Sequence, residues 1–212
     1  MSVTESRKFR FTLTERLLGT CPPKEVYEKY VLGKAPVPDD EESIEELETV
    51  AGQTEKKLIT RFHQDPDGVY LLDYQIKGFL KEAGNILKDT LANSKSKKSG
   101  VKNLRSKIDN YVFVFPRYVW LKEAPDGEFA RTIRCQTPQG PRVAIGCAEY
   151  IEPGTSFDLK IDLFPHAEIT WELIEQLLDF GAYKGIGQFR NGSYGRFTWE
   201  VLNNGNGNGN SN

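Results

Sequence analysis

The chain is poor in the residues that build thiolate, metal and membrane sites. Its 212 residues include three cysteines, two histidines and no Cys-x-x-Cys pair, which argues against a thiolate zinc site and favours a reducing compartment. No run approaches the roughly 18 apolar residues of a membrane span, and the polar, basic start of the chain is unlike a secretory signal. A Ser/His/Asp signature, a Walker loop and a dinucleotide fingerprint are also missing. We therefore expect a cytoplasmic protein without membrane contact, bound metal or cofactor.

Charge is nearly balanced overall but unevenly distributed. The chain has 28 basic and 30 acidic residues, a net charge of −2, whereas a free nucleic-acid binder is commonly basic. Residues 39–48 form an acidic block, while residues 77–107 carry nine Lys or Arg against two Asp or Glu. A local positive surface is therefore compatible with the negative total, although a solvated face is the simpler explanation of each block taken alone.

Hydrophobic periodicity predicts an α+β fold. Residues 8–13 alternate between apolar and polar, as in a strand with one buried face. Apolar residues between 76 and 91 recur at steps of three and four, which predicts an amphipathic helix from about Asp73, and a second such helix follows a cap near Thr170. The remaining predicted strands are a central strand at Tyr111–Phe115, extended by Arg117–Leu121, hairpin arms at Phe129–Cys135 and Arg142–Tyr150, and strands at Ser156–Leu163 and Phe197–Val201.

This order of elements is that of the split β-α-β unit. It predicts a ferredoxin-like (RRM-like) antiparallel sheet with two helices. We expect a single domain over residues 1–202, with an insertion at 20–67 after the first strand and a β-hairpin insertion at 125–150. Residues 203–212 are an Asn/Gly repeat that we expect to be disordered.

The most informative segment is the glycine-rich stretch 185–197, between the second helix and the last strand. Its four glycines permit positive φ and close backbone approach to a ligand, and consecutive amides in such a loop can bind an anion. Arg190 and Arg196 offer planar forks for phosphate, while Phe189 and Tyr194 offer faces for a base. The segment fits nucleic acid, although a glycine-rich turn with an aromatic anchor is an equally simple interpretation.

Four segments, in the expected order, resemble the RAMP superfamily, the ferredoxin-like RNA-binding proteins of CRISPR systems, and most of all the backbone-type subunits. Residues 185–195 match the pattern Gly-hydrophobic-Gly-x-x-Arg-x-x-x-aromatic-Gly, and residues 149–157 match Glu-x-hydrophobic-x-x-Gly-Thr-x-Phe. Residues 67–83 are similar to the segment that opens the first helix, and residues 9–21 to the first strand. The chain departs from the pattern at residues 72–75, which replace Pro-Gly-Ser-Ser and leave the contacts of that motif to RNA phosphate unsupported.

The resemblance implies a subunit of a CRISPR-type ribonucleoprotein effector complex that holds single-stranded guide RNA through its glycine-rich loop. Its expected partners are RNA and other subunits, and the hairpin would separate bases and contact neighbours. The residues that the resemblance assigns to RNA binding are Lys77, Gly78, Lys81, Arg131, Arg134, Lys184, Gly185, Gly187, Arg190, Tyr194, Gly195 and Arg196. Tyr194 could equally pack beneath the loop.

Two other functions stay open. An endoribonuclease of the same fold would use a histidine as general acid/base, or an aspartate with Mg²⁺. The candidates are His63, in an expected loop, with Asp65 and Asp67, although a surface histidine and a solvated acidic loop are simpler explanations. A protein-interaction module, or a mimic that kept the fold and lost RNA, would fit the net charge of −2 and the altered first-helix segment.

Overall fold

A four-stranded antiparallel sheet organises the molecule, in the computed structural model that describes residues 3–22, 59–92, 101–137 and 140–202. The strand order is β11-β1-β10-β6, and every neighbouring pair is antiparallel. The strands are β1 (Glu5–Leu13), β6 (Val112–Phe115), β10 (Ser156–Leu163) and β11 (Phe197–Leu202). Helix α3 (Asp73–Ala92) lies between the first two along the chain, and α5 (Trp171–Asp179) lies between the last two. This confirms the predicted α+β, ferredoxin-like fold.

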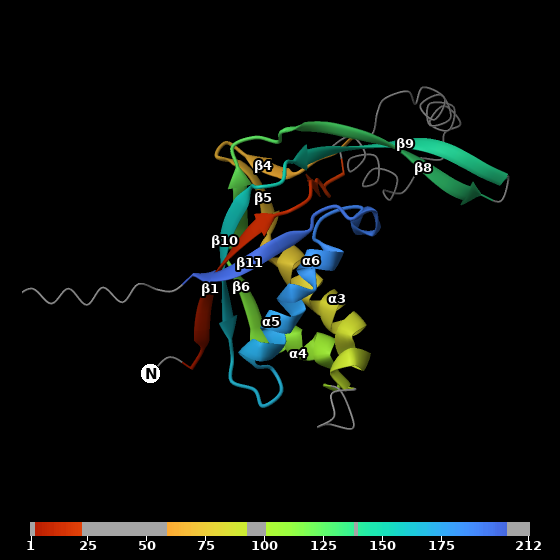
Figure 1. Cartoon of the computed structure of the whole chain (residues 1–212). Helices are drawn as coiled ribbons and strands as arrows, with labels where there is room; N and C mark the ends of the chain where they lie inside the picture. The colour runs from red at the N-terminus through yellow and green to blue at the C-terminus, as the bar shows by residue number, and fades with distance from the viewer. Residues whose placement is uncertain (1–2, 23–58, 93–100, 138–139, 203–212) are drawn as a thin grey trace, which may run out of the picture.

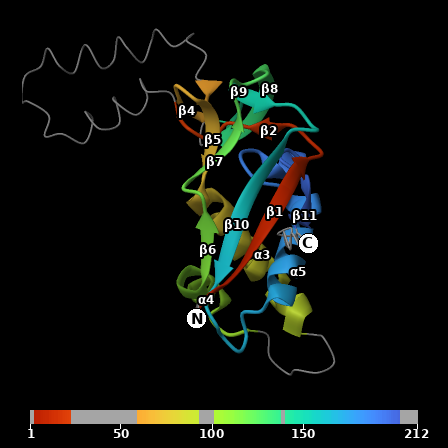
Figure 2. The same cartoon turned by 90° about the vertical axis from the view of Figure 1, so that its left-hand side faces the viewer.

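The described helices cover one face of the sheet, and none of them lies on the other face (Figures 1 and 2). Because successive side chains of a strand point to opposite faces, Phe9 and Phe11 of β1 are fully buried toward the helices. Arg10, between them, faces the other way and pairs across the sheet with Asp158. The register therefore follows from the alternation seen in the sequence, since a slip by one residue would expose both phenylalanines.

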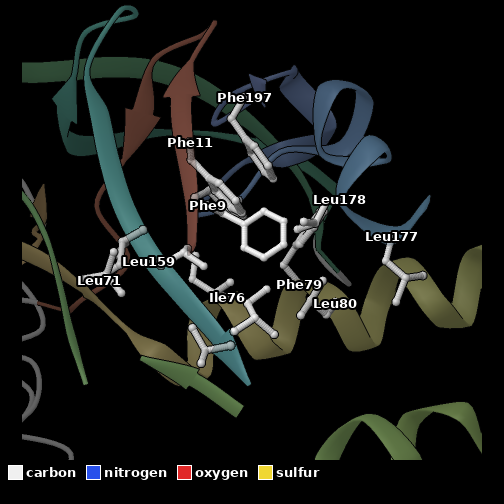
Figure 3. Close-up of a cluster of buried hydrophobic side chains, with 14 of the residues drawn as sticks. Phe9, Phe11, Leu71, Ile76, Phe79, Leu80, Leu159, Leu177, Leu178 and Phe197 are labelled. Atoms are coloured by element: carbon white, nitrogen blue, oxygen red, sulfur yellow. The ribbon is translucent and has the colours of Figure 1, made fainter. Parts of the chain in front are cut away.

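The core lies between this sheet and helices α3 and α5 (Figure 3). The rings of Phe11 and Phe197 stack with centroids 4.4 Å apart, and Phe79 of α3 meets Phe197 edge-on at 5.5 Å. Each buried side chain of this size contributes roughly 1.5–3 kcal/mol to folding. Thr170 caps α5 by accepting a hydrogen bond from the Leu173 amide, as the sequence predicted.

Two smaller sheets extend the body. The first has the order β4-β5-β7, and the second has the order β2-β9-β3, with β8 paired to β9. The long hairpin β8–β9 confirms the predicted hairpin and extends away from the body (Figure 1). The bounds are β2 (Leu17–Leu18), β3 (Ile59–Thr60), β4 (His63–Asp65), β5 (Gly68–Leu72), β7 (Tyr118–Lys122), β8 (Gly127–Thr137) and β9 (Gly140–Ile151).

A buried carboxylate ties the chain together where it returns after residues 23–58. Glu149 is 7% exposed; it accepts hydrogen bonds from Arg61 Nη1 and from the Phe62 amide, both at 2.9 Å. Next to it, Cys21 and Arg61 exchange two main-chain hydrogen bonds of 2.8 Å. These contacts join the two described parts of the predicted insertion 20–67. Most of that insertion lies outside the described residues, as does the tail 203–212.

Three details of the sequence-based fold are wrong. Strand β6 was predicted to be central but lies at an edge of the sheet, because an apolar run indicates burial and not the number of neighbours. Residues 117–121 do not extend it: after a cis Phe115–Pro116 bond they form β7 in another sheet. His63 lies on a strand and not in a loop. The short helices α4 (Leu104–Tyr111) and α6 (Gly181–Lys184), and strand β5, were not predicted.

Candidate nucleic-acid interface

The glycine-rich loop is built around close backbone contacts of its own. Gly185, Gly187 and Gly195 have φ values of 72°, 79° and 70°, in the region that favours glycine. A Cβ on Gly195 would lie 1.9 Å from the Ile186 carbonyl oxygen, and one on Gly185 would lie 2.4 Å from the Tyr194 carbonyl oxygen. The glycines are therefore required by the fold of the loop, whatever it binds.

Several loop amides already have partners within the protein. Ile186 N donates to the Gly195 carbonyl at 2.9 Å, and Gly195 N donates to the Arg16 carbonyl at 2.7 Å. The amides of Gly185, Gly192 and Ser193 also donate to main-chain carbonyls. These five amides hold the loop in shape, so side chains are the groups through which this part of the loop can reach an anion.

Two of the predicted cations meet on one carboxylate of α3. Arg190 Nη1 forms an ion pair with Glu82, and Lys184 Nζ lies 3.5 Å from the same carboxylate. Lys184 also donates to Asn191 Oδ1 at 3.2 Å. The structure brings Lys184 and Arg190 together, but Glu82 offsets much of their charge. Arg196 points elsewhere, and its Nε donates to the Tyr183 carbonyl at 3.0 Å.

The predicted cations at the start of α3 contact α4 and not the glycine-rich loop. Lys77 Nζ donates to the Asp109 carbonyl at 2.8 Å, and Lys81 forms an ion pair of 2.8 Å with the Asp109 carboxylate. Burial lowers the pKa of the Lys77 ammonium, partly offset by the attraction of Asp109. Gly78 lies between them on the helix, and a Cβ added there would meet nothing within 4 Å.

Arg131 is a predicted cation that lies against an aromatic ring and not against a described carboxylate. Its guanidinium lies 3.8 Å over the Phe189 ring centroid, and its Nε and Nη1 atoms are buried without a hydrogen-bond partner among the described residues. Burial lowers the pKa of this guanidinium, against a raising influence from Tyr194, but arginine stays protonated. A buried N–H without an acceptor costs about 1–3 kcal/mol, so this group is suited to an acceptor supplied from outside.

Aromatic rings join the glycine-rich loop to the base of the hairpin. Tyr194 packs between Phe129 of β8, at 5.4 Å, and Phe189, at 5.6 Å. Phe189 adopts φ of 55°, unusual for a side chain of this size, and remains 43% exposed. We call Phe129, Arg131, Phe189 and Tyr194 the loop–hairpin cluster. Tyr194 has the packed position that we weighed against stacking, and Phe189 offers the more open face.

The remaining predicted residues lie elsewhere. Arg134 is on β8, and its side chain lies outside the described part. His63 stacks on Tyr70 at 5.8 Å on the small β4-β5-β7 sheet, and Asp65 accepts a hydrogen bond from the Asp67 amide within their own turn. Across the described residues, no group of three His, Cys, Asp or Glu is arranged to hold a metal ion.

Sequence reasoning missed two contributors to this region. Glu82 was counted only as one of two acidic residues in a basic segment, because nothing local shows that a helix residue will meet a loop 108 positions later. Phe129 was predicted to lie in the hairpin without a role. No sequence pattern indicates either contact. Glu82 of α3 and Phe129 of β8 meet the glycine-rich loop only because the fold places both elements beside it.

No family model and no curated protein matches this chain. Among the solved structures that are similar in shape are two CRISPR complexes, both at low identity. A chain of a type IV-B CRISPR complex has a TM-score of 0.46 and 11% identity, with 95% of this chain and 92% of that chain covered. A chain of the type III-B Cmr-β complex bound to cognate target RNA has a TM-score of 0.45 and 13% identity, and here 93% of this chain spans 61% of the other. These values do not show membership of a family. None of the described helices is long and apolar enough to cross a membrane.

Proposed function

We propose that this chain binds single-stranded RNA at the loop–hairpin cluster, as a subunit of a CRISPR-type ribonucleoprotein complex. The observation that supports this most is Arg131, which keeps its charge while two of its buried nitrogens have no acceptor among the described residues. A phosphate or a base carbonyl would supply that acceptor. The motif resemblance supports the assembly and the kind of RNA.

The cluster combines the two elements that single-strand binding requires. Bases stack on exposed aromatic faces, with about 1–3 kcal/mol for each base, and Phe189 is 43% exposed. Guanidinium groups neutralise phosphates and make binding sensitive to salt. The ring and the cation are already in contact, at 3.8 Å, and a phosphate reaches the two buried nitrogens of Arg131 once the side chains that cover them move aside. Other subunits would contact the chain through surfaces outside this cluster.

A protein-interaction module is the second candidate, and a specific observation favours it. Glu82 pairs with Lys184 and Arg190, and Asp109 pairs with Lys81. A chain under selection to bind a polyanion has little reason to neutralise its own cations in this way. If RNA binding fails in the experiment below, this candidate takes its place.

The test is binding of a labelled single-stranded RNA of about 30 nucleotides, longer than the roughly 4–16 nucleotides of compact single-strand sites, across a salt series. We expect Arg131→Ala to weaken binding about tenfold and to reduce the salt slope by about one. Arg7→Ala is the matched control, because Arg7 also stacks on a ring, Trp171 at 4.5 Å, but is paired with Glu175 at 2.7 Å. It should bind RNA as the wild type does.

A stability measurement separates function from folding at the same position. Since the unpaired nitrogens of Arg131 oppose folding, Arg131→Met should leave the free energy of unfolding unchanged or raise it by about 1 kcal/mol, while RNA affinity falls. Denaturant unfolding checks this. No RNA binding at low salt, or equal binding by wild type and Arg131→Ala, would contradict the proposal.

A further inference from the structure

The small sheet carries an exposed aromatic surface that the proposed function does not use. His63, Tyr70, Tyr118 and Trp120 all lie on the face of β4-β5-β7 turned away from the core, and we call them the aromatic patch. Tyr70 is at its centre, 4.7 Å from Tyr118 and 5.2 Å from Trp120, between ring centroids. The buried residues of β7 are the alternate ones, Val119 and Leu121. The patch is therefore an ordered face and not a loosely packed edge.

The patch borders a pocket on the helix-free side of the main sheet. Tyr118 is 45% exposed and Trp120 is 39% exposed. Trp120 also lines a pocket of about 350 Å³, together with Arg10, Pro116, Ser156, Phe157 and Asp158. Figure 2 shows β7 and β5 above β6 and beside the upper part of β10. Exposed rings and a pocket of side-chain size are features of the centre of a protein interface.

The charges around the patch favour a protein partner over a polyanion. Arg117 pairs with Asp73 at 2.6 Å, Lys122 with Asp126 at 2.6 Å, and Arg10 with Asp158 at 2.7 Å. Each of these rim cations is thus matched by a carboxylate, whereas single-strand binding requires uncompensated positive charge beside the aromatic rings. A rim in which positive and negative side chains are equal in number does not repel an identical rim on a second molecule.

We propose that the aromatic patch is the contact between two copies of this chain, patch against patch. A two-fold contact brings the same surface of each copy together, so that surface must complement itself. Stacked or edge-to-face rings and alternating paired charges meet that requirement. The exposed Tyr118 ring of one protomer fills the pocket beside the Trp120 ring of its partner. The net charge of −2 adds little repulsion.

The experiment is sedimentation equilibrium of the full chain over about 1–100 µM, the range of weak specific contacts. We expect a monomer–dimer equilibrium whose dissociation constant rises at least about tenfold in Trp120→Ala, because rings near the centre of an interface dominate binding. Tyr118→Lys places two like charges across the two-fold axis and should abolish the dimer. Tyr183→Ala is the control, since Tyr183 is 73% exposed but lies on α6, away from the patch.

The outcomes are independent of RNA binding. Trp120→Ala and Tyr118→Lys should bind RNA with wild-type affinity, and Arg131→Ala should still dimerise. A thermal melt should show that Tyr118→Lys is folded, because the side chain at position 118 lies outside the core. A wild-type chain that stays monomeric throughout, or a dimer that both patch variants retain, would overturn the proposal whatever the RNA experiment shows.

Discussion

The loop–hairpin cluster and the aromatic patch are both groups of exposed rings beside basic residues, yet they differ in charge compensation. In the cluster, Arg131 has two buried nitrogens that find no partner in the described part of the chain. Beside the patch, Arg10, Arg117 and Lys122 are each paired with an aspartate. Aromatic content alone therefore does not separate a nucleic-acid surface from a protein surface. The state of the neighbouring cations does, and it can be changed one residue at a time.

The largest effect should come from breaking the loop while leaving the patch intact. Gly195→Ala places a Cβ 1.9 Å from the Ile186 carbonyl oxygen at a φ of 70°, so we expect a loss of about 3 kcal/mol or more in unfolding free energy. Gly78→Ala is the matched glycine variant, because its Cβ meets nothing within 4 Å. It should raise stability by about 0.5–1 kcal/mol. Denaturant unfolding measures both, and equal effects would show that the loop geometry is wrong.

The next effect should come from releasing cations beside the cluster. Glu82→Gln keeps the size of the side chain but removes the negative charge that Arg190 and Lys184 share. RNA affinity should then rise about three- to tenfold and the salt dependence should steepen, because two cations become available to phosphate. Glu175→Gln removes a charge paired with Arg7 instead, and it should change neither quantity. Lower affinity in Glu82→Gln would mean that the ion pairs position the loop for RNA.

The smallest effect should come from removing one partner of an ion pair beside the patch. Hydrogen bonds from Lys122 and from the Glu152 amide hold the pKa of Asp126 below its usual range. Their stabilisation is present above a pH of about 4, the ordinary aspartate pKa, and is lost as the pH falls through the lowered folded-state pKa. Asp126→Asn should therefore cost less than about 1 kcal/mol at neutral pH. That cost should shrink in acid, as the pH falls through the lowered pKa of Asp126. Unfolding curves over a pH series test this.

The fold was predictable where local patterns decide it. The alternation around Phe9 and the cap at Thr170 each specify an element without reference to the rest of the chain, and both are confirmed. The edge position of β6 depends on which strands pair, and no local pattern reports that. Helix α4 buries only Leu104 and Ile108, so its apolar signal was too sparse beside the basic residues around it.

The candidate site was predictable in its residues but not in their charges. The glycine-rich segment identified Arg190, yet its partner Glu82 is 108 positions away. Arg131 was one of several hairpin arginines in the sequence, and only the packing of Phe189 beneath it distinguishes it. The aromatic patch combines residues of three strands, and no motif in the sequence indicates that these strands pair. Whether a cation is free is a property of distant neighbours.

The pair Cys21 and Arg61 gives the chain a fixed exit and return point, joined by two hydrogen bonds of 2.8 Å and supported by Glu149. Because this stem holds its two strands together, the cost of closing a flexible sequence spliced in beside it grows slowly, by about 0.6 kcal/mol for each doubling of its length. This stem is therefore a place to graft a fluorescent reporter or an affinity module onto the molecule. Such a graft would leave the core, the glycine-rich loop and the small sheet with their own connections intact.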